Sequence, residues 1–475
     1  MQKKIPYAVA LLPLIILISL IAYNLYFYKS ESLEGANQYA LLFSGFCAII
    51  IALIYKKKWS RIQDSIITNI KDSSLILFIL LLVGALSGTW LVSGIIPAMM
   101  YYGLKILHPD IFLVACCLIS AMVALASGSS WSTIATVGIA LIGIGQALGF
   151  SNGIISGAII SGAYFGDKMS PMSDTTNVAA AVTKSDLFLH IRYMMYTTVP
   201  SFLITIIIFS FLGSSTNEIN IQNINQILKV LENTFNINFW LFLTPIILII
   251  LIIYKTPPLK SLMIASLLGC VFAIIFQTDV LTTLSGEESF GFKTICISII
   301  QAITSETYIE TENDMINNIL SSGGMHGMLN TIWLIISAMF FSGAMQGASL
   351  LKRITFPLIK NTKKTIKLIS STAGTCLFFN ITTSDQYLSI VVPGRMFSDA
   401  YKEQGLASEN LSRTLEDTGT VTSVLIPWNT CGATQSAILG VSTLTYMPFC
   451  FFNIISPIMT IAFAFFNIKI KKLKI

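Results

Sequence analysis

The sequence predicts an all-α polytopic membrane protein built as an inverted-topology repeat of two five-crossing halves, with two re-entrant hairpins and discontinuous helices. The composition is the first reason: of 475 residues, 54% are hydrophobic and only 11% are charged, and the mean hydropathy is +0.76. A soluble domain carries roughly 25% charged residues, so much of this surface must face lipid. The second reason is a pair of polar breaks in apolar sequence, centred on Asp167 and Asp417, at matching positions in the two halves.

Ten apolar stretches are long enough to cross a bilayer, which takes about 20 helical residues. Three of them are long for one span and contain Gly or Pro, which predicts discontinuous helices, and these are 74–104, 152–188 and 405–440. The other seven stretches are 5–28, 39–55, 190–213, 239–254, 260–276, 328–350 and 445–467.

Two further apolar stretches, 110–148 and 368–398, carry polar residues near the middle. Backbone that leaves the helical conformation at membrane depth is tolerated where it is buried in protein or lines a cavity. We therefore expect two re-entrant hairpins, each entering and leaving on one side of the membrane.

The basic residues predict the orientation of the chain. With the N-terminus in the cytoplasm, four basic groups lie on the cytoplasmic side, and the acidic connection 277–327 lies outside. Cytoplasmic loops of membrane proteins carry an excess of Lys and Arg, so this distribution predicts ten crossings with both termini cytoplasmic. The four groups are Lys56–Lys58, Lys255 with Lys260, Lys352–Lys367 and Lys469–Lys474.

The chain divides into a first half at 1–213, a polar linker at 214–238 and a second half at 239–475. Each half has two helices, a broken helix, a hairpin, a second broken helix and a final helix. Five crossings is an odd number, so the halves face opposite ways and their hairpins converge near the membrane midplane. This arrangement is typical of secondary transporters, whose substrate sites lie at the repeat interface.

The two breaks offer the oxygen ligands that a hard cation such as sodium prefers: carboxylates, hydroxyls, amides and carbonyls freed where a helix unwinds. We expect sodium to bind through Asp174, Asn177 and Asn429, and Asn177 and Asn429 to lie close together. The alternative is that these are ordinary loop residues between helices. The full set of candidate cation- and proton-binding residues is Asp167, Ser173, Asp174, Thr175, Thr176, Asn177, Asp385, Asp417, Thr420, Thr422, Asn429 and Thr430.

Hydroxyl-rich tips are expected where each hairpin turns. A tip brings helix ends to mid-membrane depth, where terminal amides favour anions and terminal carbonyls favour cations. The alternative is that these small side chains pack closely and cap the helix ends. The tip residues are Ser129, Ser130 and Thr133 in the first hairpin and Thr382, Thr383 and Ser384 in the second.

Proton coupling requires a carboxylate that changes its protonation state during transport. Lys168 either forms an internal ion pair or reaches back to the cytoplasmic interface. The histidines (His108, His190 and His326) fall in expected loops or interfaces, which argues against a histidine proton relay. The acidic candidates are Asp167, Asp174, Asp385, Glu416 and Asp417.

The composition also argues against several other functions. The net charge of +6 is not gathered into one stretch, so nucleic-acid binding is not indicated. No C-x-x-C pair is present among the eight cysteines, so neither a zinc site nor a redox motif is predicted. Without a histidine metal cluster or an activated nucleophile, the sequence indicates a protein that is not an enzyme and has no resident cofactor.

Five motifs resemble those of NhaC-type sodium/proton antiporters. They are SGAYFGDKMSPMSDTTN (161–177), DQYLSI (385–390), PGRMF (393–397), LSRTLED (411–417) and IPWNTCGA (426–433). Ser132 in the first tip departs from the pattern, since a glycine is more usual there. The resemblance implies a bacterial inner-membrane antiporter of the broader ion-transporter superfamily, whose members resemble one another in inverted repeats, two re-entrant hairpins and often a dimeric elevator arrangement.

The resemblance leaves the exchanged substrate open, because similar proteins include malate/lactate antiporters and other organic-substrate carriers. The leading hypothesis is exchange of sodium for protons across the cytoplasmic membrane by alternating access. The alternative is a sodium- or proton-coupled carrier of a small organic anion or an amino acid. No arginine lies in either break or tip to bind a carboxylate through two hydrogen bonds, which favours ion-only exchange.

Overall fold

A computed structural model describes residues 5–28, 35–214, 221–311, 317, 320–359 and 364–473. Within these ranges the regular structure is helical, except for one antiparallel pair of strands, β1 (Thr307–Tyr308) and β2 (Ser321–Ser322). Among the described residues, eight helical segments are long and apolar enough to cross a membrane, and two bent helix pairs raise the number to ten. The all-helical, multi-pass prediction is confirmed, while the opposite orientation of the two halves stays a prediction.

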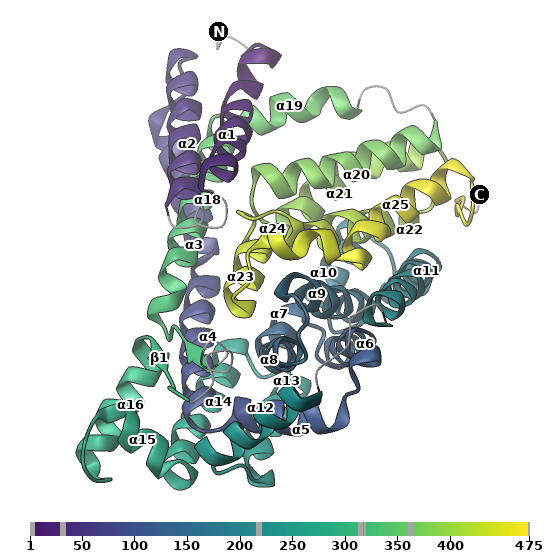
Figure 1. The fold of residues 1–475 in the computed structure, drawn as a ribbon. Coiled ribbons are helices and arrows are strands. Elements are labelled where there is room, and N and C mark those ends of the chain that lie inside the picture. Colours follow the sequence, from purple (N-terminus) through teal and green to yellow (C-terminus); the bar gives the residue numbers. More distant parts are fainter. Residues whose placement is uncertain are drawn as a thin grey trace.

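An upright group of helices forms one side of the molecule (Figure 1). It contains α1 (Tyr7–Tyr28), α2 (Ala36–Ile54), α3 (Trp59–Asp72), α4 (Ser74–Val92) and α18 (Leu329–Gly347), and α18 packs against both α2 and α3. Many large apolar side chains on the outer faces are exposed, including Ile15, Phe46 and Ile54. Exposed apolar faces of this kind are expected of helices that contact lipid.

The stretch 74–104 is discontinuous, as expected, but the predicted start at residue 74 is too late in the chain. Helix α4 continues α3, so that Trp59–Val92 forms one candidate span of 34 residues. The charged residues of α3 concealed this continuation, although its buried residues Ile62, Ile66 and Asn69 repeat at helical spacing. The break comes at Gly94, whose left-handed backbone (φ 77°) precedes α5 (Ile95–Ile106).

The first predicted hairpin turns at Gly128, between α6 (Pro109–Ser127) and α7 (Ser130–Thr133). The chain continues through a π-helical turn, η2 (Ile134–Gly138), into α8 (Ile139–Ala147). The turn lies where the sequence predicted it. That both arms stay on one side of the membrane remains a prediction.

Helices α6 and α9 (Asn152–Met169) pack closely because glycines line their interface. A Cβ atom added to Gly162 would lie 2.0 Å from the Cys117 carbonyl oxygen, and one added to Gly166 would lie 2.2 Å from that of Ala121. Neither position has room for a side chain, and this close packing fixes the end of α9 that carries Asp167.

The predicted breaks in 152–188 and 405–440 are both observed. In the first, α9 ends at Met169 and α10 (Asp174–Thr183) begins four residues after the extended Ser170, which precedes Pro171. In the second, α22 (Ser408–Leu415) gives way to η5 (Glu416–Thr420), a π-helical turn. The second break then continues through η6 (Ser423–Leu425) to α23 (Thr430–Leu439).

The region expected to be a polar linker forms a helix in its described part, α12 (Ile221–Thr234). The buried side chains Ile227, Leu231 and Phe235 explain it, because their spacing gives the segment one apolar face. A bend of 93° leads to η3 (Phe239–Phe242) and α13 (Leu243–Ile253). The connection 277–327 also contains helices, α15 (Thr278–Ser285) and α16 (Phe292–Thr304), after α14 (Pro258–Phe276).

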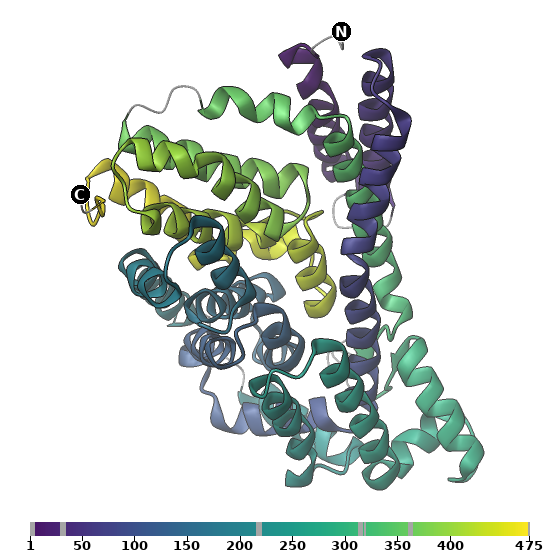
Figure 2. The same cartoon turned by 180° about the vertical axis from the view of Figure 1, so that it is seen from behind.

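The second predicted hairpin consists of α20 (Thr365–Thr382) and α21 (Gln386–Glu403), which pack against each other on either side of a tip at Thr383–Asp385. Figure 2 shows the helices from α20 onward lying above the first-half helices around α6 to α11. The remaining elements are α11 (Leu187–Ser214), α19 (Leu350–Ile359), α24 (Thr443–Tyr446), η7 (Met447–Phe449) and α25 (Phe451–Phe465).

The predicted orientation can be tested by labelling single cysteines in a variant whose eight native cysteines are replaced by alanine or serine. Glu288 and Lys58 are both exposed, and they lie in loops predicted to face outside and inside respectively. A membrane-impermeant thiol reagent added to intact cells should modify Glu288→Cys and leave Lys58→Cys unmodified until the cells are permeabilised. Labelling of Lys58→Cys in intact cells would contradict the orientation.

Candidate functional site

A cavity of about 420 Å³ lies where the two hairpin tips meet the breaks. Part of its lining comes from the end of α3, from α4 and from the segment that includes α13 and the start of α14. The rest comes from both tips, both breaks and the helices that follow them. The tip and break residues that line it are Ser127, Gly128, Ser129, Trp131, Ser132, Asp167, Met172, Asp174, Thr175, Asp385, Gln386, Tyr387 and Thr430.

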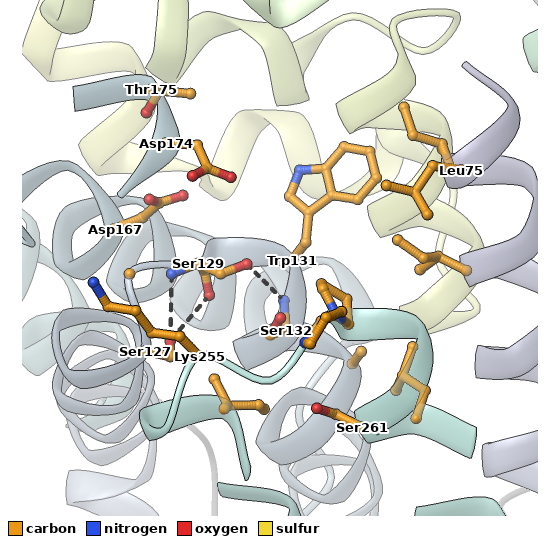
Figure 3. A pocket seen from close by; sticks show the side chains of 18 of the residues that line it. Leu75, Ser127, Ser129, Trp131, Ser132, Asp167, Asp174, Thr175, Lys255 and Ser261 are labelled. Atoms are coloured by element: carbon orange, nitrogen blue, oxygen red, sulfur yellow. Dashed lines mark hydrogen bonds between the residues drawn. The ribbon is translucent and has the colours of Figure 1, made fainter. Parts of the chain in front are cut away.

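The charge of the cavity is predominantly negative. Its described lining contains four carboxylates, those of Asp72, Asp167, Asp174 and Asp385, and one basic side chain, Lys255. Figure 3 shows the carboxyl groups of Asp167 and Asp174 near each other on one side of the Trp131 indole, with Leu75 on the opposite side. This lining suits a cation better than an anion.

Asp167 connects the first break to the first tip. It lies near the end of α9, and only 6% of the residue is exposed. The Ser130 backbone N–H and hydroxyl both donate to its Oδ2, over 2.9 and 2.7 Å. Both hydrogen bonds come from the first residue of α7, so Asp167 holds the first tip against the end of α9.

Lys168, the next residue, forms an ion pair with Asp417 in the second half, and both side chains are fully buried. The sequence left open whether Lys168 pairs internally or reaches the interface, and the structure shows an internal pair. The Thr197 and Thr460 hydroxyls donate to Asp417 Oδ2 over 2.8 and 2.5 Å. The Ser456 hydroxyl donates to Oδ1 over 3.4 Å. The pair therefore joins the two breaks inside the protein.

The hydroxyls of Thr197, Ser456 and Thr460 were not predicted as site residues. Thr197 is adjacent to Thr198 in α11, and Ser456 and Thr460 are separated by apolar residues in α25; none of them stands beside an acidic residue in the chain that would mark it as part of a site. Only the position of Asp417 in the fold shows what these hydroxyls contact.

The rest of the first break is held by local hydrogen bonds. Ser173 caps α10, accepting from the Thr176 backbone N–H over 3.5 Å, and the Thr176 hydroxyl donates to the Lys168 carbonyl over 3.0 Å. The Asn177 amide donates to the Ser173 and Pro171 carbonyls over 2.7 and 3.0 Å. Asp174 is left exposed at the start of α10, facing the cavity.

Asn380 on α20, which was not among the predicted site residues, organises the second break. Its amide donates to the Gly419 carbonyl over 2.8 Å and to the Thr422 hydroxyl over 3.0 Å. The Asn429 amide donates to the Asn380 carbonyl over 3.1 Å. The Gln386 amide donates to the Thr420 carbonyl over 3.0 Å, which joins the second tip to this break.

The predicted site residues divide between the cavity and its support. Ser129, Asp167, Asp174, Thr175, Asp385 and Thr430 line the cavity. The hydroxyls of Thr133, Thr382 and Thr383 instead donate to carbonyls four residues earlier, over 2.7–2.8 Å, and the role of the tips in binding stays a prediction. Asp174 lines the cavity, but Asn177 and Asn429 are absent from its described lining, and their joint binding of sodium stays a prediction.

His190, which was expected in a loop or at an interface, lies in the first turn of α11. This residue is fully buried on α11, and its Nδ1 lies 2.7 Å from the Ser412 hydroxyl oxygen. The apolar neighbours of His190 in the chain did not reveal that this face of α11 packs against α22. Across the described ranges, no group of three or more His, Cys, Asp or Glu residues is arranged to hold a resident metal ion.

Comparison with known proteins identifies similar membrane transporters. The profile of the Na+/H+ antiporter family matches residues 162–468. The chain is 35% identical over 472 residues to the Na(+)/H(+) antiporter NhaC of Alkalihalophilus pseudofirmus, a match that covers 99% of this chain and 98% of that relative.

Two other relatives carry names with different substrates. The chain is 33% identical over 421 residues to the malate-2H(+)/Na(+)-lactate antiporter of Bacillus subtilis, which covers 88% of this chain and 87% of the relative. It is also 33% identical over 473 residues to the arginine/ornithine antiporter ArcD of Halobacterium salinarum, covering 98% of this chain and 93% of the relative.

Proposed function

Because the chain belongs to the Na+/H+ antiporter family, we propose that it exchanges sodium ions for protons across the cytoplasmic membrane by alternating access. The protein is a multi-pass secondary transporter and not an enzyme. Family membership leaves the exchanged solutes open, because the names of similar proteins refer to different substrates. The proposal therefore depends on the chemistry of the cavity.

The observation that carries the proposal is the acidic cavity between the two tips. Sodium prefers oxygen ligands, and Asp167 and Asp174 place carboxylates on the same side of this cavity. Thr175 and Thr430 add hydroxyl oxygens from the two breaks. We place the sodium site at Asp167 and Asp174, with Asp385 on the opposite tip as a further acidic group.

Exchange follows if sodium binding at these carboxylates and proton binding at the buried acids beside them exclude each other. An uncompensated carboxylate in a low-dielectric site is expensive, so one of the two cations must be bound before the transporter changes conformation. A transporter that holds neither cation stays in its starting conformation. Sodium bound from one side would therefore be exchanged for protons bound from the other.

The volume of the cavity supports a second candidate, the exchange of an organic solute. A space of about 420 Å³ falls within the range of pockets that hold small molecules and is far larger than a bare ion needs. The acidic lining fits a cationic amino acid better than malate or lactate, because Lys255 is the sole base among the described lining residues. Of the two substrate types in the relatives' names, the arginine/ornithine type suits this charge better.

The decisive experiment uses purified protein in proteoliposomes that contain no organic acid or amino acid. An imposed sodium gradient should drive protons in the opposite direction, recorded by a pH-sensitive dye inside the vesicles. Because the two cations compete, the apparent sodium affinity should fall as the pH is lowered.

Protein-free liposomes provide the baseline for proton leakage. If no sodium-driven proton movement is recorded until lactate or malate is added, organic-anion exchange would replace ion-only exchange as the proposed function. Recovery on adding arginine or ornithine would instead support the cationic alternative.

A further inference from the structure

Glu416 is a fully buried acidic residue that does not line the cavity. It begins η5, immediately before Asp417, and none of its side chain is exposed. Both of its carboxyl oxygens lack a hydrogen-bond partner among the described residues. The Thr420 hydroxyl faces this carboxyl from the next turn and makes no hydrogen bond of its own within the described structure. Few buried polar groups in proteins are left in this condition, so the arrangement requires an explanation.

The surroundings of Glu416 are short of positive charge. Lys168 faces Glu416 but is already paired with Asp417. Asp417 also accepts hydrogen bonds from three hydroxyls, whereas Glu416 accepts none in the described structure. Two neighbouring acids thus share one lysine. Because Glu416 has no partner, it must be neutral while it is buried.

The other titratable groups near Glu416 do not supply the missing charge. Asp167 on α9 is an additional acid, and Cys376 on α20 is a thiol. Arg413, three residues earlier and fully buried, has its guanidinium carbon 4.6 Å from the centre of the Tyr193 ring, and its Nη1 donates to the Lys469 carbonyl over 3.3 Å. Its Nε and Nη2 have no hydrogen-bond partner in the described structure, and so they do not bind the Glu416 carboxyl. One bound proton on Glu416 would balance the Lys168, Asp417 and Glu416 cluster.

We propose that Glu416 is the residue that binds and releases the exchanged proton, an inference that rests on the proposed cation/proton exchange. With the proton bound, Glu416 is a neutral acid, and Lys168 pairs with Asp417 alone. When the proton leaves to water, the Glu416 carboxylate competes with Asp417 for Lys168. Deprotonation therefore weakens the ion pair that joins the two breaks, which couples the proton to the conformation of the site.

The test compares Glu416→Gln with a matched control, Glu409→Gln. Glutamine keeps the shape of the neutral acid but cannot exchange a proton. Glu409 lies seven residues earlier on α22 and pairs over 2.5 Å with Lys471, whose side chain is 41% exposed, and neither residue lines the cavity. Both variants remove one carboxylate from the segment 408–420. Only Glu416 belongs to the buried cluster with Lys168 and Asp417.

In proteoliposomes, sodium-driven proton movement should fall at least about tenfold in Glu416→Gln. Exchange of radioactive sodium for unlabelled sodium should continue, because the cavity carboxylates remain. Glu409→Gln should resemble the wild type in both assays. Sodium-driven proton movement at the wild-type rate in Glu416→Gln would overturn the proposal. Glu416→Leu, which is also neutral, replaces Glu416→Gln if the latter does not fold.

A second readout does not depend on which solute the protein exchanges. Infrared spectroscopy of the purified protein should show the carbonyl stretch of a protonated carboxyl group that is missing from Glu416→Gln and present in Glu409→Gln. If the wild type moves no protons with sodium, the sodium proposal fails, while loss of this band in Glu416→Gln still supports Glu416 as the proton site. An unchanged band in Glu416→Gln would overturn the inference whatever the transport assays show.

Discussion

Replacing Lys168 by methionine is expected to abolish transport and to lower the free energy of unfolding by about 3–5 kcal/mol. The physical reason is the complete burial of the ion pair with Asp417. Methionine keeps most of the length of the side chain but leaves the Asp417 carboxylate buried without a cation. The hydroxyls of Thr197, Ser456 and Thr460 can donate hydrogen bonds to that carboxylate but cannot neutralise it.

The double variant Lys168→Met, Asp417→Leu separates stability from transport. Replacing a whole buried ion pair by apolar side chains of similar size is often neutral or stabilising, so the double variant should unfold near the wild-type temperature. It should still fail to transport, because the charged link between the breaks is gone. Thermal unfolding in detergent, followed by intrinsic fluorescence, and flux in proteoliposomes give the two readouts.

Lys293→Met provides a matched control, because Lys293 forms an ion pair with Glu287 while 74% of its side chain is exposed. An exposed pair contributes about 0–1 kcal/mol, so this variant should keep both stability and transport. Transport by the double variant would show that the buried pair serves the fold alone. If Lys168→Met were as stable as the wild type, that result would contradict a buried ion pair between Lys168 and Asp417.

The second large effect is expected at the cavity, where Asp174→Asn should reduce sodium-driven flux to background at low sodium. The substitution preserves size but removes the negative charge that faces the cavity from the start of α10. Losing one interaction with a charged ligand costs roughly 1.5–3 kcal/mol, which is about ten- to a hundredfold in affinity. Flux should recover in part at high sodium if binding alone is weakened.

Folding should be nearly unaffected by Asp174→Asn, because the residue is exposed and its helix-terminal charge contributes about 0.3–1 kcal/mol. Asp186→Asn provides the control: Asp186 is also exposed at a helix start, where its carboxylate accepts from the Leu189 backbone N–H over 2.9 Å, and it does not line the cavity. Normal flux in Asp174→Asn at low sodium would remove Asp174 from the site.

The sequence predicted the elements whose signals are local. Apolar length identified most candidate spans, and Pro171 with its polar neighbours marked the break between α9 and α10. Helices α3 and α12 were missed for a physical reason: each is amphipathic, with Ile62 and Ile66, or Ile227 and Leu231, buried beneath a polar outer face. Segments of this kind do not reach the hydropathy of a membrane span on their own, although α3 continues into α4 and α12 leads through a bend into α13.

The candidate site was only partly predictable, because its main contacts join residues that are far apart in the chain. The candidate acids were identified from their residue types, yet the sequence could not choose Asp417 as the partner of Lys168. Nor could it separate Asp174, which faces the cavity, from Asn177, whose amide is taken up by nearby carbonyls. The first distinction depends on how α9 packs against the second half, and the second on the local turn between α9 and α10.

The ion pair between the breaks also has a consequence for how the protein is made. Lys168 and Asp417 are 249 positions apart, and ribosomes add about 5–20 residues per second, so on the order of ten to fifty seconds separate their synthesis. During that interval the membrane contains a first half with a lysine whose counter-charge has not yet been translated. The first half therefore cannot complete this buried ion pair until the second half has been made, and a chain that stops early keeps Lys168 without its partner.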